Sequence, residues 1–164
     1  MAEPVTSSPF AVLSLIVAPA ILTNASSVLA MSTSNRLARA VDRARDLARQ
    51  IESADTPADD QARLLRELMV SEDRAVLLLR VLRSFYTAMG AFALATLLSL
   101  IGAVAAAGGV ATAVRALEVS AVAAGTVAVG ALVHGAVLLF RETGMAVTML
   151  RERVERVRAR RTTR

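Results

Sequence analysis

Three uncharged apolar stretches, each long enough to cross a bilayer as a helix, constrain the fold of this chain more than any other feature. They cover residues 10–31, 85–108 and 119–140, which gives lengths of 22, 24 and 22 residues. About 20 helical residues at 1.5 Å per residue span a hydrocarbon core of roughly 30 Å. None of the stretches contains Asp, Glu, Lys or Arg. We therefore predict an all-α membrane protein with three transmembrane helices.

The composition agrees with helices packed in lipid. Of the 164 residues, 55% are hydrophobic but only 3% are aromatic, because most of the apolar residues are Ala, Val and Leu. Small residues favour association of helices in a bilayer, since they let the backbones approach closely. The chain has no cysteine, which excludes a disulfide framework, a thiolate zinc site and a cysteine nucleophile.

The arginines predict the orientation. All 19 basic residues are arginine, with none before the first stretch, ten between the first and second, Arg115 between the second and third, and eight after the third. Arginine-rich segments stay in the cytoplasm. We therefore expect a multi-pass protein of the bacterial plasma (inner) membrane, with its N-terminus outside and its C-terminus cytoplasmic. Ala18-Pro19-Ala20 resembles a signal-peptide cleavage site, but no positive region precedes it, so we expect a retained anchor.

These stretches divide the chain into seven predicted segments. Residues 1–9 form an external disordered lead, 10–31 the first transmembrane helix, and 32–84 a cytoplasmic helical hairpin. Residues 85–108 form the second transmembrane helix, 109–118 a short external loop, 119–140 the third transmembrane helix, and 141–164 a basic cytoplasmic helix. No helix breaker lies between residues 31 and 36, so the first transmembrane helix is free to continue into the hairpin. The sequence does not determine whether it does so or ends there.

Apolar periodicity predicts the faces on which the two arms of the hairpin pack. The first arm carries an expected seam of small and apolar residues at Leu37, Val41, Ala44, Ala48 and Ile51. On the second arm the expected face comprises Leu65, Leu68, Ala75, Leu79 and Leu82. Spacings of three and four residues are typical of helices that pack against other helices. On the wet face, the spacing of Arg63 and Glu67 predicts an ion pair.

A polar patch lies in the first apolar stretch. Thr23, Asn24, Ser26 and Ser27 fall within an arc of about 160° on a helix, and Ser34 follows along the same side. Polar side chains at membrane depth face either a bundle interior or a water-filled path. The patch therefore either lines a pathway or holds helices together through hydrogen bonds.

His134 is the only histidine and, apart from Tyr86, the only titratable side chain within the three stretches. An intramembrane ionisable group suggests a proton or ion step, with Asn24 as a candidate partner. The alternative is a neutral imidazole bonded to a carbonyl or hydroxyl group, because no acidic residue shares its depth.

Several short motifs resemble a known family. Residues 19–27 read Pro-Ala-Ile-Leu-Thr-Asn-Ala-Ser-Ser, and Ser34-Asn35-Arg36-Leu37 and Asp42-Arg43 follow. This pattern resembles the bacterial domain of unknown function 2721 family, and the resemblance covers nearly the whole chain. It implies an uncharacterised three-span membrane protein without an established activity. Asn35 and Arg36 would form a membrane-exit motif, with Arg36 able to reach phosphate groups.

No motif points to an enzyme, a cofactor or a metal. A P-loop, a dinucleotide fingerprint and a nucleophile with an adjacent base are all missing from the sequence. We expect no nucleic-acid binding, because residues 36–83 interleave ten arginines with nine acidic residues. One hypothesis is a homo-oligomeric, channel-like pore lined by the first transmembrane helix. The alternative is a membrane-anchored structural or regulatory scaffold that binds a cytoplasmic protein partner through its helices.

Overall fold

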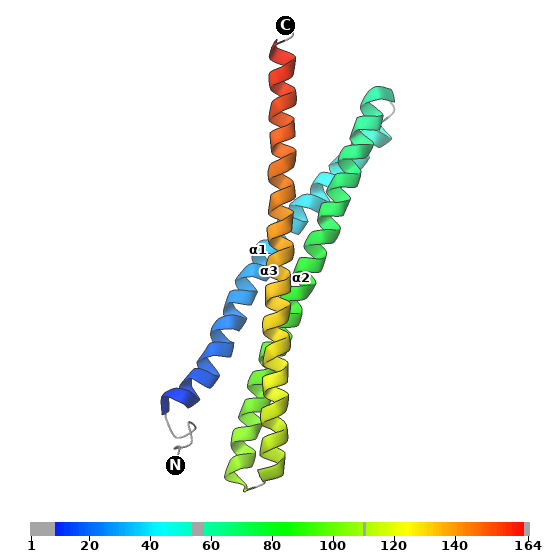
Figure 1. Cartoon of the computed structure of the whole chain (residues 1–164). Helices are drawn as coiled ribbons and strands as arrows, with labels where there is room; N and C mark the ends of the chain where they lie inside the picture. Colours follow the sequence, from blue (N-terminus) through cyan, green and yellow to red (C-terminus); the bar gives the residue numbers. More distant parts are fainter. Residues whose placement is uncertain (1–8, 54–57, 110, 163–164) are drawn as a thin grey trace. The chain divides into compact units, whose positions relative to one another are not determined.

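The computed structural model contains three long α-helices (Figure 1). It describes the backbone of residues 9–53, 58–109 and 111–162, and the side chains of residues 17, 20–53, 60–109 and 111–144. Helix α1 is Pro9–Glu52, α2 is Ala58–Ala107 and α3 is Ala111–Thr162. The described backbone contains no strand. The predicted all-α class is therefore confirmed.

The helices contribute to two compact units. The first unit comprises Met1–Ser32 and Leu82–His134, and the second comprises Thr33–Val81 and Gly135–Arg164. Helix α1 is continuous from Pro9 to Glu52. The first apolar stretch therefore runs directly into the first arm of the predicted hairpin, because nothing between residues 31 and 36 breaks the helix.

The first unit is built around a seam of aromatic and small residues. On α2, Phe85, Ala88, Phe92 and Ala95 are buried at spacings of three, four and three residues. Ala88 and Phe92 form a core cluster with Ala128 of α3. A spacing of 3.5 residues is typical of helices that pack side by side along their length. Small residues at this seam let α2 and α3 approach closely.

The outward faces of α2 and α3 are apolar and exposed. Segments Asp60–Ala107 and Ala111–Gly144 are long and apolar enough to cross a membrane, and only 22% and 11% of the most apolar part of each is buried. In water such large uncovered apolar surfaces are unfavourable, whereas lipid chains cover them at no cost. Within the predicted first span, the described side chains are those of residues 17 and 20–31, and the large apolar ones among them that are exposed are Val17, Ile21, Val28 and Met31.

The connection between α2 and α3 is a tight glycine turn. Gly109 has a φ of +75°, in the left-handed region that glycine adopts without strain. The Gly108 and Gly109 amides donate to the carbonyl oxygens of Ala105 and Ala106, at 3.1 and 3.2 Å. Helix α3 then begins at Ala111. The connection is therefore shorter than the loop predicted for residues 109–118, because alanine-rich sequence continues as helix.

On α1 the second unit packs along the predicted side, because all five residues of the predicted seam are half-buried. The fully buried residues are Thr33, Ala40 and Leu47, and the last two each lie one position before a residue of the predicted seam, Val41 and Ala48. The Ser71 hydroxyl of α2 donates to the Ala40 carbonyl oxygen at 3.1 Å. This bond brings the two backbones close together, and the small Ala40 side chain permits the approach.

The predicted face of the second arm was wrong at two positions. Leu65 and Leu79 are exposed, whereas Leu78 and Val81 are fully buried. The hydrophobic pattern could not separate Leu78 from Leu79, because both lie in a run of three leucines. The predicted ion pair between Arg63 and Glu67 is confirmed, with 3.3 Å between Arg63 Nε and Glu67 Oε1.

Candidate functional site

A buried carboxylate on α3 is the centre of the second unit. Glu142 is only 1% exposed, although it follows the third apolar stretch by just two residues. It lies seven residues after the buried Gly135, so the helical period turns both residues to the same side of α3. An isolated carboxylate in such a place would be strongly unfavourable.

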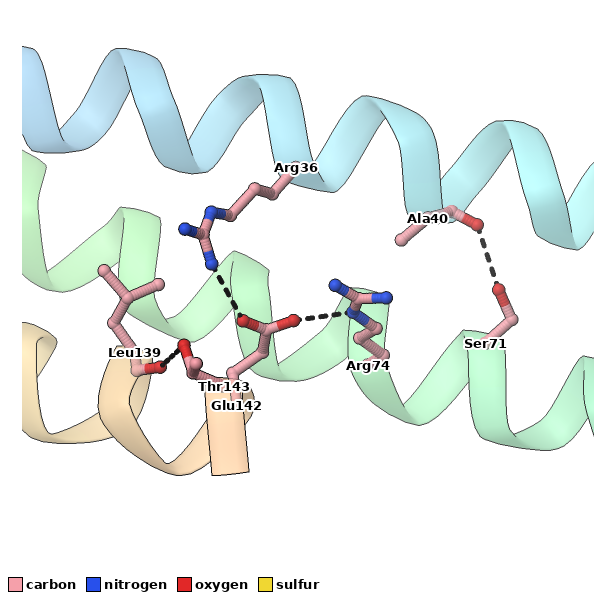
Figure 2. Close-up of polar contacts among 7 residues, drawn as sticks. All are labelled: Arg36, Ala40, Ser71, Arg74, Leu139, Glu142 and Thr143. Carbon is pink, nitrogen blue, oxygen red and sulfur yellow. Dashed lines mark hydrogen bonds and ion pairs between the residues drawn. The ribbon is translucent and has the colours of Figure 1, made fainter. Parts of the chain in front are cut away.

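Two arginines from two other helices neutralise Glu142, and Figure 2 shows both reaching it. Arg36 of α1 donates from Nη1 to Oε2 at 3.2 Å, and Arg74 of α2 donates from Nε to Oε1 at 2.6 Å. Each carboxylate oxygen therefore has its own guanidinium partner. No buried side-chain nitrogen or oxygen lacks a partner in the described part of the chain. We call this set of contacts the Arg36–Glu142–Arg74 bridge; it ties all three helices of the second unit together.

A hollow of about 310 Å³ lies beside the bridge, between α1 and α2. Its described lining consists mainly of arginines, together with one hydroxyl and one methyl group: Arg36, Arg39, Arg43, Arg74, Ser71 and Ala40. We call it the arginine hollow. The 3.1 Å hydrogen bond between Ser71 and the Ala40 carbonyl fixes its two walls against each other (Figure 2).

The charges around the arginine hollow are only partly balanced. Glu142 compensates part of the charge of Arg36 and Arg74. Glu67 lies 3.1 Å from Arg43 Nη2, and it also bonds Arg63. Arg39 forms no ion pair with any described side chain and is exposed. Among the described residues, four guanidinium groups therefore share two carboxylates, and the hollow carries net positive charge.

Packing within the chain occupies part of the predicted polar face of α1. Ser26 is fully buried and donates to the Leu22 carbonyl oxygen at 2.7 Å. Ser27 donates to the Thr23 carbonyl oxygen at 2.9 Å, and its hydroxyl also lies 3.8 Å from the Met89 sulfur of α2. Both hydroxyls are thus satisfied without a neighbouring subunit.

The other predicted site residues lie in different surroundings. Asn24 and His134 are exposed in the first unit, and the structure shows no hydrogen bond between them. In the second unit, Ser34 is half-buried and Asn35 is exposed. Arg36 is the one member of the predicted membrane-exit motif that enters the bridge.

Sequence reasoning missed Glu142, Arg74, Arg39 and Ser71. A signal for the bridge was available: Arg36 and Glu142 are opposite charges that each follow a predicted span within a few residues. Two charges at matching depths become neighbours only where the ends of their helices lie on the same side of the bundle and the right faces meet. The sequence does not reveal which helix faces meet, so the pairing could not be derived from spacing alone.

The described residues offer no metal centre. Among them, no group of three or more His, Cys, Asp or Glu side chains is placed to hold a metal ion. The chemistry that the site does present is a set of fixed guanidinium donors around a small volume, next to one buried carboxylate.

A family model described as "Protein of unknown function (DUF2721)" matches residues 16–152. The matched region includes the polar face of α1, the apolar parts of α2 and α3, and the whole Arg36–Glu142–Arg74 bridge. The resemblance drawn from the motifs of α1 is thereby confirmed. No curated protein and no solved structure matches the chain.

Proposed function

The chain belongs to the DUF2721 family, and we propose that it is a non-enzymatic membrane scaffold. In this proposal three helices cross the bacterial plasma membrane, with the N-terminus outside. The second unit is a cytoplasmic helical platform that binds a partner protein. The observation that carries the proposal is a stripe of exposed apolar residues on the part of α2 that belongs to the second unit.

The distribution of charge supports an extramembrane second unit. It contains the exposed ion pairs Asp42–Arg45 and Asp46–Arg49, in addition to those of Glu67. In the first unit, the charged side chains among the described residues are Arg83, Arg115 and Glu118, and each lies within four residues of the start of a predicted span. Charges are strongly disfavoured in lipid, so the second unit is the part suited to water. Its many arginines favour the cytoplasmic side.

The apolar stripe on α2 consists of Leu65, Met69, Val76 and Leu79, whose exposed fractions are 46%, 64%, 49% and 58%. These spacings of four, seven and three residues place all four within about 80° of helix circumference. The pattern is the seam of a coiled coil, in which a second helix covers the exposed residues. The core of this unit lies on another side of α2, at Leu78 and Val81. The stripe is therefore available to a partner helix.

Site-specific photo-crosslinking in cells tests the scaffold proposal. The photoreactive residue p-benzoylphenylalanine replaces Val76 in the stripe, and in the control it replaces Val70. Val70 is also exposed, but it points about 120° away around the helix. We expect a crosslinked product of defined mass from position 76 and little from position 70. Equal crosslinking at both positions, or none at position 76, would contradict the proposal.

The second candidate function is a homo-oligomeric pore, and the exposure of Asn24 and His134 favours it. Both belong to the first unit, where lipid is a poor environment for an amide or an imidazole. A neighbouring subunit could supply their hydrogen bonds. Ser26 is fully buried within the chain, so the whole polar face of α1 is not available to line a pore.

The number of subunits discriminates between the two functions. Native mass spectrometry of the protein released from nanodiscs gives this number directly. A closed ring of about five or more subunits would provide an axis for α1 to surround. Asn24→Leu should then change the conductance without changing assembly. A monomer or dimer would exclude a pore built from one helix per subunit, and loss of assembly in the variant would identify Asn24 as a packing residue.

A further inference from the structure

We propose that the arginine hollow of the second unit binds a phosphate group, either of a free phosphorylated molecule or of an anionic lipid headgroup. The residues that would carry the binding are Arg36, Arg39, Arg43 and Arg74. The hollow is distinct from the apolar stripe on α2. The anion proposal does not depend on a partner helix at the stripe, although its lipid arm rests on the membrane topology of the proposed function.

The donor chemistry of the hollow fits a phosphate. Guanidinium groups present paired N–H donors in a planar fork that matches phosphate oxygens. Arg74 bonds Glu142 through Nε, so its two terminal nitrogens are not part of that contact. Arg39 has no carboxylate partner among the described residues and lines the same volume. The hollow therefore has guanidinium donors left over for an anion.

The hollow is also held in shape before any ligand arrives. Glu142 fixes Arg36 and Arg74 from one side, and the bond from Ser71 to the Ala40 carbonyl fixes the spacing of α1 and α2. Donors that are already in place lose less conformational freedom when a ligand binds. In this interpretation the buried carboxylate positions two guanidinium groups for the anion.

The size of the hollow suits a small anionic group. A volume of about 310 Å³ lies at the lower end of the range of roughly 300–1,000 Å³ found for pockets that enclose small molecules. A phosphate with a compact substituent fits this volume.

The position of the arginines along α1 explains why both sources remain possible. Arg36 follows the predicted first span by five residues, or about 7 Å of helix. The headgroup layer on each side of a bilayer is roughly 5–8 Å thick, so Arg36 would lie at headgroup depth. Arg43 lies seven residues further along α1, about 10 Å deeper into the cytoplasm. A lipid phosphate would approach from the Arg36 end, and a free anion from the Arg43 end.

The test compares two arginine variants of the full chain. Arg39→Gln removes a donor that lines the hollow but is not part of the bridge. Arg45→Gln removes the same charge from the same helix, at a side chain that is 72% exposed and not part of the described lining. Any effect of net charge alone should be equal in the two variants. Circular dichroism and thermal unfolding verify that both variants remain folded. A third variant, Arg39→Lys, keeps the positive charge but lacks the planar guanidinium group, and it shows whether charge alone is enough for binding.

Two probes separate the sources. Isothermal titration calorimetry with inorganic phosphate, on protein in phosphatidylcholine nanodiscs, measures the free anion. Retention of phosphatidic acid from mixed phosphatidylcholine–phosphatidic acid micelles, measured by mass spectrometry, tests the headgroup. We expect Arg39→Gln to weaken binding of at least one probe by about tenfold, since one charge-assisted hydrogen bond is lost. Arg45→Gln should leave that binding nearly unchanged.

Each result decides the proposal. Binding of phosphate alone identifies a free anion as the ligand, and retention of phosphatidic acid alone identifies a lipid headgroup. Binding of both supports a site that recognises the shared phosphate group. If the unmodified protein binds neither probe, or if Arg39→Gln and Arg45→Gln weaken binding equally, the hollow is not a phosphate site and its arginines serve only the ion pairs of the second unit.

Discussion

At Glu142, a carboxylate that is 1% exposed lies between guanidinium groups from two other helices. Moving a charge out of water is unfavourable, and only well-placed partners compensate for the loss of hydration. The net contribution of such a bridge to the free energy of unfolding is small. Its main effect is to favour one arrangement of the helices, because any change of register would leave Glu142 unpaired. We therefore regard the bridge as the feature that fixes the register of the second unit.

A double-mutant cycle measures the bridge. We expect Arg36→Ala and Glu142→Ala to be coupled by about 1–3 kcal/mol in the free energy of unfolding. The exposure of Arg36, 37%, keeps the value below that of a fully buried pair. Unfolding of the detergent-solubilised protein in sodium dodecyl sulfate provides the measurement. The matched control is Asp42 with Arg45, an exposed pair 3.9 Å apart, for which we expect a coupling below about 0.5 kcal/mol. Similar couplings in the two cycles would mean that burial of Glu142 has no energetic consequence.

Ser71 provides a second prediction at the residue scale. Its hydroxyl bonds a carbonyl of another helix at 3.1 Å, so Ser71→Ala should lower the free energy of unfolding by about 0.5–1.5 kcal/mol. Ser99 instead donates to the Ala95 carbonyl of its own helix at 2.9 Å, a kind of bond that adds little to stability. Ser99→Ala is therefore the control, with an expected change near zero. An equal loss in both variants would show that the contact between α1 and α2 is not a specific one.

At the scale of the element, two adjacent leucines of α2 differ completely in environment. Leu78 is fully buried in the second unit, whereas Leu79 is 58% exposed. We expect Leu78→Ala to lower the free energy of unfolding by about 2–5 kcal/mol, because it leaves a cavity. Leu79→Ala should change it by less than about 0.5 kcal/mol in the isolated protein. Chemical unfolding of the two variants under identical conditions gives the comparison. The reverse order would mean that α2 packs on the face predicted from its sequence.

The same leucines show how far the sequence determines these elements. Length and the absence of charge were sufficient to predict that residues 85–108 and 119–140 are helical, since only a helix satisfies its own backbone across such apolar stretches. Hydropathy could not orient α2 in the second unit, because Leu77, Leu78 and Leu79 are equally apolar. Ser71 and Leu78 lie seven residues apart on one face of α2, and the bond from Ser71 to the Ala40 carbonyl, a contact between residues far apart in sequence, shows that α1 packs against this face.

The candidate site was less predictable than the helices. Arg36 was identified because it follows the first span, and the structure places it in the bridge. Glu142 was not identified, because a carboxylate in an otherwise basic segment is most simply interpreted as a surface residue. Its burial depends on Arg74, which is 68 residues away in sequence. A pairing over that distance is determined by the packing of three helices, and no local sequence pattern predicts it.

At the scale of the whole molecule, the two units divide the chain by chemistry. The described residues of the first unit present an apolar exterior with few charges, and those of the second unit carry the ion pairs and the arginine hollow. This division is what a membrane would impose on three long helices, since apolar faces are stable in lipid and ion pairs in water. The central proposal is the topology in which the first unit crosses the bilayer and the second lies in the cytoplasm.

Cysteine labelling tests this topology most directly, because the chain contains no cysteine and each introduced one is unique. Ser7→Cys and Thr112→Cys should react with a membrane-impermeant maleimide on intact cells, or on spheroplasts if an outer membrane blocks access. Ser53→Cys should react only after the membrane is permeabilised. Protection of Ser7→Cys together with labelling of Thr112→Cys would mean that α1 does not cross the bilayer. Labelling of Ser53→Cys on intact cells would contradict a cytoplasmic second unit.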